Sequence, residues 1–200
     1  LFQVLVIRQL GDTQYGQYNI VLAWAGLFSV IGDLGITQYY RREIARDRTT
    51  TGKYFWDMVT LRLLLAIVTT VVTVGGALLF LRPLDDQKLI AIVLFTSTYF
   101  LQAFLIPMTS VLEGHERLDV VSVFVVIGQV IFLTAGGLFL WAGKNYVWMV
   151  IAALLNIPIL ITFTYRFMRH NNLGPPRFHL NPGLWWSIIQ YGIPFGLIQL

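Results

Sequence analysis

The sequence predicts an all-α, polytopic membrane protein, and two observations lead to that fold class. Of the 200 residues, 56% are hydrophobic and only 12% are charged, about half the charged share of a typical soluble domain. The apolar residues also fall in solid runs of about 20, the length that crosses a bilayer as a helix. A membrane β-barrel would instead alternate in polarity over segments of about ten residues. Intrinsic disorder is excluded, because it requires low hydrophobicity.

Seven apolar segments follow one another along the chain. The five complete ones, each long enough to span a bilayer with some tilt, cover residues 18–40, 55–81, 89–112, 120–141 and 146–167. A short run precedes them at 1–10, and another begins near Ile188. Because neither end run is long enough to cross the hydrocarbon, we expect the chain to be an internal piece of a longer protein.

The predicted domain organisation is one transmembrane lobe over 1–179, followed by a distinct segment over 180–200. That second segment contains a Pro182-Gly183 break and then Trp185 and Trp186. It is predicted to form either an interfacial helix before a truncated seventh span or simply the early start of that span.

The distribution of Lys and Arg predicts the orientation. We define side A as the side that holds the connection after residues 18–40, and side B as the opposite side. Side A receives Arg41, Arg42, Arg46, Arg48, Lys53, Arg117, Arg166, Arg169 and Arg177, whereas side B receives Arg8, Arg82, Lys88 and Lys144. The positive-inside rule then makes side A and the N-terminus cytoplasmic and places the protein in the cytoplasmic (plasma) membrane. The net charge of +4 is therefore a topology signal and gives no reason to expect nucleic-acid binding.

Two charged residues stand out inside the predicted spans, Asp33 and Arg62. Counted from the flanking basic or aromatic boundary at 1.5 Å per residue, they lie about 12 Å and about 10 Å from side A. Equal depth on consecutive antiparallel helices predicts that they face one cavity and pair. Two alternatives stay open: Arg62 snorkels to the headgroups, or Asp33 makes a structural contact at a kink near Gly32 and Gly35.

Three amides, Gln102, Gln129 and Asn156, lie near the middle of successive spans. One amide per helix predicts a polar lumen, and interhelical hydrogen bonding is the alternative. The chain has no cysteine, and His115, His170 and His179 lack the spacing of metal ligands. No glycine-rich phosphate loop is present, so no enzymatic activity, metal or cofactor is predicted.

Three motifs near the beginning of the chain resemble those of one transporter family. They read R-Q-L-G-D-T-Q-Y-G-Q-Y from Arg8, G-D-L-G-I from Gly32 and R-R-E-I-A-R from Arg41, and a later Y-G-I-P-F-G begins at Tyr191. This pattern is similar to that of the polysaccharide (O-antigen type) flippases of the multidrug/oligosaccharidyl-lipid/polysaccharide exporter superfamily.

The resemblance implies two six-helix lobes around a central cavity, with this chain as the N-terminal lobe. In such flippases a cationic cavity holds the diphosphate of a polyprenyl-linked oligosaccharide, which crosses the membrane by alternating access. The implied anion-attracting residues are Arg41, Arg42 and Arg62, with Arg8 at the outer end and Asp33 on the D-x-G position of the family. The implied partners are the lipid bilayer, the lipid-linked oligosaccharide and proteins of polysaccharide assembly. The coupling ion, or use of the membrane potential, stays open.

Three other functions remain as alternatives. A drug/cation antiporter of the same superfamily would favour an acidic cavity, whereas the acid singled out inside the spans, Asp33, is matched by Arg62. A membrane glycosyltransferase or polymerase would carry acids or a large loop on the outer face, and the side-B loops are short, with Asp12, Asp85 and Asp86. The third alternative is a structural or assembly subunit. The polar residues inside the spans argue against it.

Overall fold

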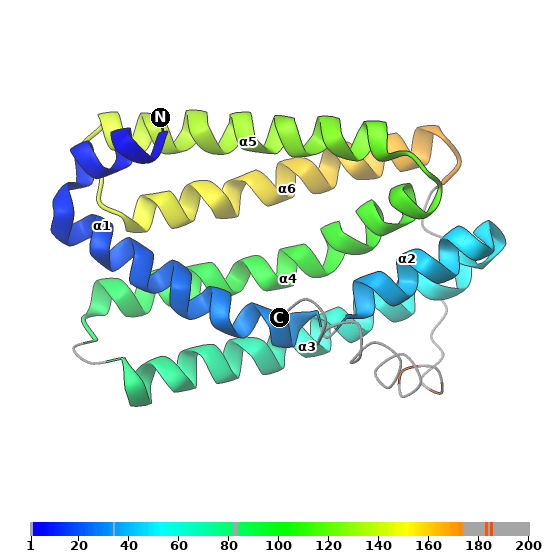
Figure 1. The fold of residues 1–200 in the computed structure, drawn as a ribbon, viewed down its shortest axis with the longest axis horizontal. Helices are drawn as coiled ribbons and strands as arrows, with labels where there is room; N and C mark the ends of the chain where they lie inside the picture. Colours follow the sequence, from blue (N-terminus) through cyan, green and yellow to red (C-terminus); the bar gives the residue numbers. More distant parts are fainter. Residues whose placement is uncertain (1, 34, 82–83, 174–182, 184, 186–200) are drawn as a thin grey trace.

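A computed structural model describes residues 2–33, 35–81, 84–173, 183 and 185. Every regular element in these residues is helical, which confirms the predicted all-α class (Figure 1). The elements are α1 (Phe2–Ser29), η1 (Val30–Gly32), α2 (Ile36–Arg46), η2 (Arg48–Thr50), α3 (Thr51–Phe80), α4 (Asp86–Gly114), α5 (Leu118–Trp141) and α6 (Val147–His170). Within this part of the chain four helices are long and apolar enough to cross a membrane, or five if the bent pair α1–α2 is one span. The chain is therefore a multi-pass membrane protein.

The helix α1 is two helices joined at Gly11. This glycine has φ 72° and ψ 168°, a backbone conformation that residues with a side chain rarely adopt. The chain turns back at this end of the bundle, so that the segment before Gly11 lies beside α5 while the rest of α1 crosses the bundle (Figure 1). The sequence predicted residues 1–10 as a segment separate from the next span, and in the structure the two are joined by a turn at Gly11 alone.

A second break interrupts the span predicted over 18–40. Here the α-helix tightens into η1, Gly35 takes a left-handed conformation with φ 75°, and α2 continues at an angle of 46°. The expectation of one continuous helix is therefore wrong at this point. The physical reason is the left-handed glycine, which ends one helix and precedes the first residue of the next.

The long helices pack in the spatial order α3, α4, α6, α5, with α1 crossing α3, α4 and α5 and α2 lying on α4. Three apolar clusters of the described residues hold this bundle together. The side-B cluster is built around Val21, Ile92 and Met149, and the side-A cluster around Ile44, Leu112 and Met168. A third cluster, between α2 and α3, is built around Ile36, Tyr40 and Met58. Two prolines, Pro107 and Pro158, lie within the continuous helices α4 and α6.

Much of the apolar surface of the bundle is exposed, as a lipid environment requires. On α3, Val71 and Phe80 are 65% and 77% exposed, and on α5 Val125 is 65% exposed. Large side chains such as these contact hydrocarbon at no cost in a bilayer, whereas in water they would form aggregation-prone patches.

The short connection on side A between α2 and α3 is closed by a local capping arrangement. Asp47 Oδ1 accepts hydrogen bonds from the backbone N–H of Thr49 at 3.0 Å and from its hydroxyl at 2.6 Å. Both bonds favour the ionised carboxylate, so they lower the pKa of Asp47.

The predicted interfacial helix and seventh span, apart from Gly183 and Trp185, lie outside the described residues.

Candidate functional site

A polar cavity opens between the break in the first span and the middle of α3 and α4. Its volume is about 370 Å³. The side chains around it come from four helices and from η1: Ser29, Gly32, Asp33, Thr37, Gln38, Arg41, Arg62, Ala66, Tyr99, Gln102, Ile106 and Thr109. We call this the side-A cavity, since all of these residues lie in the middle or side-A half of their helices.

The core of the side-A cavity is a hydrogen-bonded network of Asp33, Thr37 and Arg62. The Nη2 group of Arg62 donates to Asp33 Oδ1 and to Thr37 Oγ1, and the Thr37 hydroxyl donates to the same carboxylate oxygen. The Arg62 side chain is only 7% exposed, and that of Asp33 is 29% exposed. The predicted pairing is therefore confirmed, and the burial of Arg62 rules out the snorkelling alternative.

The break in the helix places these groups. Gly35 turns the chain so that α2 starts at the level of Arg62, and Thr37 then lies within reach of Asp33 four residues earlier. The backbone N–H of Thr37 points at Asp33 Oδ1 at 3.4 Å, so the carboxylate faces the otherwise unpaired start of α2. The kink near Gly32 and Gly35 and the ion pair, which the sequence left as alternatives, thus occur together.

A second cation, Arg41, lies at the side-A end of the cavity. Its Nε forms an ion pair with Glu113 Oε2, which joins α2 to the end of α4. Glu113 does not line the cavity, whereas Arg41 does. Glu113 lies in the last turn of α4, and its side chain is only 17% exposed.

The charges that line the side-A cavity are two guanidinium groups and one carboxylate. Arg62 Nε is buried and makes no hydrogen bond within the described part of the chain. Neutral donors and acceptors surround the charges, including the amides of Gln38 and Gln102. An arginine-lined cavity of this kind can bind an anion, because guanidinium donors match phosphate oxygens in pairs.

The structure does not bring all of the predicted site residues into this cavity. Gln102 lines it, but Gln129 lines a different cavity near side B. Asn156 lies against Gly128 between α5 and α6, where an added Cβ at Gly128 would be 3.4 Å from its amide. Arg42 and Arg8 are exposed and lie outside both cavities.

One buried acid was overlooked in the sequence. Asp57, on the first turns of α3, has no exposed surface. The indole Nε1 of Trp185 donates a hydrogen bond to Asp57 Oδ1 at 2.9 Å, across 128 residues of sequence. In the sequence Asp57 closely follows Lys53 and Tyr54, residues typical of a membrane boundary, where acids are usually solvated. Among the described residues no group of His, Asp or Glu side chains is arranged to hold a metal ion.

The family described as polysaccharide biosynthesis protein matches the chain over residues 1–200. Neither curated proteins nor solved structures give a match. The family match agrees with the resemblance carried by the motifs that begin at Arg8, Gly32 and Arg41.

Proposed function

Because the chain belongs to the polysaccharide biosynthesis protein family, we propose that it is part of a flippase for a polyprenyl-diphosphate-linked oligosaccharide. The protein is a membrane transporter in this proposal and carries out no chemical step on its substrate. Side A faces the cytoplasm, in agreement with the excess of Lys and Arg on that side. The substrate is loaded from the cytoplasmic leaflet and released on the opposite side.

The observation that carries the proposal is Arg62, a guanidinium that is 93% buried at the wall of a polar cavity within the bundle. A buried arginine is expensive to desolvate and is retained in membrane proteins mainly where it has a functional partner. Asp33 satisfies only part of the donor capacity of Arg62, since Arg62 Nε has no acceptor among the described residues. A diphosphate would supply the further acceptors.

Arg41 extends the cationic wall toward the cytoplasmic end of the cavity. A lipid-linked diphosphate lies close to the headgroup level of the membrane, because its isoprenoid chain stays in the hydrocarbon. Arg41 is therefore the first cation that such a diphosphate meets, and Arg62 the second, deeper one. The break at Gly35 lies between α1 and α2, the helix that carries Arg41. It provides a point at which α2 can change its angle to α1 during alternating access.

The rival antiporter for drugs or cations is less well supported by this geometry. A cation site needs a carboxylate whose charge is available to the ligand. Asp33 is instead engaged by Arg62 and Thr37. The fully buried Asp57 does not line the side-A cavity and accepts a hydrogen bond from Trp185.

The test is a transfer assay in proteoliposomes that contain a fluorescent polyprenyl-diphosphate oligosaccharide. We expect Arg41→Ala combined with Arg62→Ala to abolish transfer, while Arg46→Ala, an exposed cation of α2 outside the cavity, leaves it unchanged. Since Arg62→Ala leaves the charge of Asp33 uncompensated, the neutral pair Asp33→Asn with Arg62→Gln is assayed beside it. At normal protein level, transfer at the wild-type rate by the Arg41→Ala and Arg62→Ala variant would remove both arginines from the mechanism, and the same result for the neutral pair would remove Arg62.

A further inference from the structure

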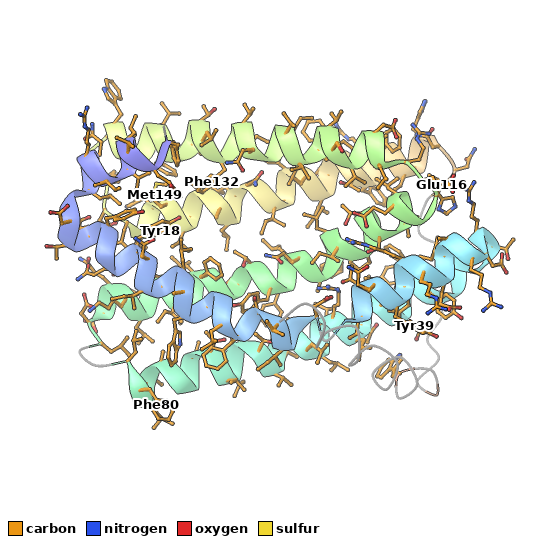
Figure 2. The ribbon with its side chains drawn as sticks, in the orientation of Figure 1. Tyr18, Tyr39, Phe80, Glu116, Phe132 and Met149 are labelled. Atoms are coloured by element: carbon orange, nitrogen blue, oxygen red, sulfur yellow. The ribbon has the colours of Figure 1, made fainter. Side chains whose placement is uncertain are left out.

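A second cavity lies near side B, where α1, α5 and α6 meet. Its volume is about 360 Å³, close to that of the side-A cavity. The residues around it come from three helices and are Phe2, Gln3, Val6, Tyr15, Tyr18, Asn19, Leu22, Gln129, Phe132, Leu133 and Met149. Tyr18, Phe132 and Met149 lie together at this end of the bundle (Figure 2). We call this space the aromatic–amide cavity.

We propose that the aromatic–amide cavity binds a sugar ring of the oligosaccharide whose diphosphate occupies the side-A cavity. This inference rests on the proposed function and deepens it by assigning a separate site to the glycan. It also gives a role to Tyr15 and Tyr18, the two tyrosines of the Y-G-Q-Y motif, which have no place in the side-A cavity.

The chemistry of the lining matches a neutral carbohydrate. A pyranose ring presents an apolar C–H face and a rim of hydroxyl groups. The aromatic rings of Tyr15, Tyr18 and Phe132 supply flat apolar surfaces for the face, and Phe2 packs edge-on against Phe132 with ring centroids 5.9 Å apart. The amides of Asn19 and Gln129 each offer both donors and acceptors for hydroxyl groups.

Other occupants fit this lining less well. All of the described residues around the cavity are uncharged, so it lacks the cations that a phosphate needs and the acids that a metal or organic cation needs. An isoprenoid chain would contact the aromatic rings, but it would leave the amides of Asn19 and Gln129 without hydrogen-bond partners at a cost in free energy. A ligand with both apolar and hydroxylated surfaces satisfies the whole lining.

The two cavities lie along one face of α1. Tyr15, Leu22 and Ser29 are spaced by seven residues, which is close to two turns of an α-helix, and so are Asn19 and Gly26. Tyr15, Asn19 and Leu22 line the aromatic–amide cavity, whereas Ser29 lines the side-A cavity. From Leu22 to Ser29 the helix rises about 10 Å.

Gly26 lies between the two cavities on this face of α1. A Cβ added at this glycine would meet no atom of the described residues within 4 Å. An oligosaccharide held by its diphosphate at Arg62 can therefore extend along α1 toward Tyr18. The first sugar, next to the diphosphate, lies near Ser29, and a later sugar reaches the aromatic–amide cavity.

The test compares three probes on the purified full-length protein by measuring dissociation constants. The probes are an isoprenyl diphosphate, the same lipid with one sugar, and the same lipid with a short linear oligosaccharide. We expect the oligosaccharide probe to bind most tightly to the wild type. We expect Tyr18→Ala and Asn19→Ala each to weaken its binding about fivefold, equivalent to one lost contact or hydrogen bond, with no change for the other two probes. Ile20→Ala, on the same turn but outside the cavity, is the matched control.

The outcomes separate this inference from the proposed function. If the wild type binds all three probes equally, or if Tyr18→Ala and Asn19→Ala weaken all three equally, the glycan site is overturned while diphosphate binding at Arg62 stands. If no probe depends on Arg62, the proposed function fails and the glycan site fails with it. Because Asn19 and Gln129 are exposed, Gln129→Ala provides a further variant in which loss of folding is not expected.

Discussion

Arg62 on α3 and Asp33 at the end of η1 form an ion pair across 29 residues of sequence, and Thr37 bonds to both partners. The pair joins the broken first span to α3 at the wall of the side-A cavity. It neutralises a guanidinium that would otherwise be buried without a counter-charge. The same contact thus supports the fold and sets the charge that a ligand meets.

A double-mutant cycle measures this coupling. We expect Asp33→Asn alone to destabilise the protein by about 3 kcal/mol, because it leaves the buried Arg62 charge without its partner. Arg62→Gln alone should cost less, because the remaining Asp33 side chain is partly exposed. The double variant should lose less than the sum of the two, with a coupling energy of at least about 1 kcal/mol. Thermal unfolding in detergent, monitored by size-exclusion chromatography, gives the loss of stability of the two single variants and of the double variant. Additive losses would show that the two side chains act independently.

The ion pair between Arg41 and Glu113 allows structure and transport to be separated. Arg41→Glu places two carboxylates together and is expected to cost about 1 kcal/mol, since the pair is partly exposed. Reversing the pair, with Glu113→Arg added, should restore the melting temperature. It should not restore transfer of lipid-linked oligosaccharide, because position 113 does not line the cavity. Recovery of transfer together with stability would mean that Arg41 serves only to hold α2 on α4.

The sequence predicted the membrane spans and the Asp33–Arg62 pair for a simple physical reason. The bilayer fixes the length of an apolar helix, and the same length scale gives the depth of each charge along it. Depth does not give the direction in which a side chain points around the helix axis. Arg41 and Arg42 are neighbours at nearly equal depth, but only Arg41 lines the cavity. In the same way Gln102 and Gln129 were grouped by depth and face different cavities.

The sequence pattern indicated a kink near Gly32 and Gly35 only as an alternative and could not show that the first span breaks there. Residues 18–40 are apolar enough for one continuous helix, and the glycines at 32 and 35 indicate only where a kink is permitted. The left-handed Gly35 makes the break, and the contact of Asp33 and Thr37 with Arg62 on another helix, which the pattern does not show, links the two helix ends to α3. The ion pair of Glu113 is a similar case, because its partner Arg41 lies 72 residues earlier in the chain and local sequence does not show the contact.

The left-handed glycine at this break is a sensitive position. We expect Gly35→Ala to destabilise the protein by about 1–2 kcal/mol, because a side chain disfavours φ 75°. If the residue relaxes toward helical angles, α2 rotates and Thr37 moves away from Arg62, so transfer should fall more than stability does. Gly137→Ala on α5, where an added Cβ meets nothing within 4 Å, is the control and should lower neither. An unchanged melting temperature and transfer rate in Gly35→Ala would contradict the assigned break.

Of the glycines whose surroundings the structure describes, Gly114, where α4 meets α2, leaves the least room for an added Cβ. A Cβ added here would lie 2.5 Å from Ile44 Cγ2 and 2.9 Å from Ile44 Cβ. The branched Ile44 is buried and cannot turn away, so the helices must separate. We expect Gly114→Ala to lower stability by about 1–3 kcal/mol, measured as a shift in melting temperature. The double variant with Ile44→Ala should recover part of that loss, and its failure to do so would place the strain elsewhere.

The orientation of the bundle can be tested with single cysteines, because the chain contains none of its own. Arg46 and Ala142 are both exposed, at opposite ends of the bundle, so Arg46→Cys marks side A and Ala142→Cys marks side B. If side A is cytoplasmic, a membrane-impermeant maleimide labels Ala142→Cys in intact cells and Arg46→Cys only after lysis. The unmodified cysteine-free protein should remain unlabelled in both conditions. Labelling of Arg46→Cys in intact cells would reverse the orientation and, with it, the assignment of Arg41 to the loading end of the cavity.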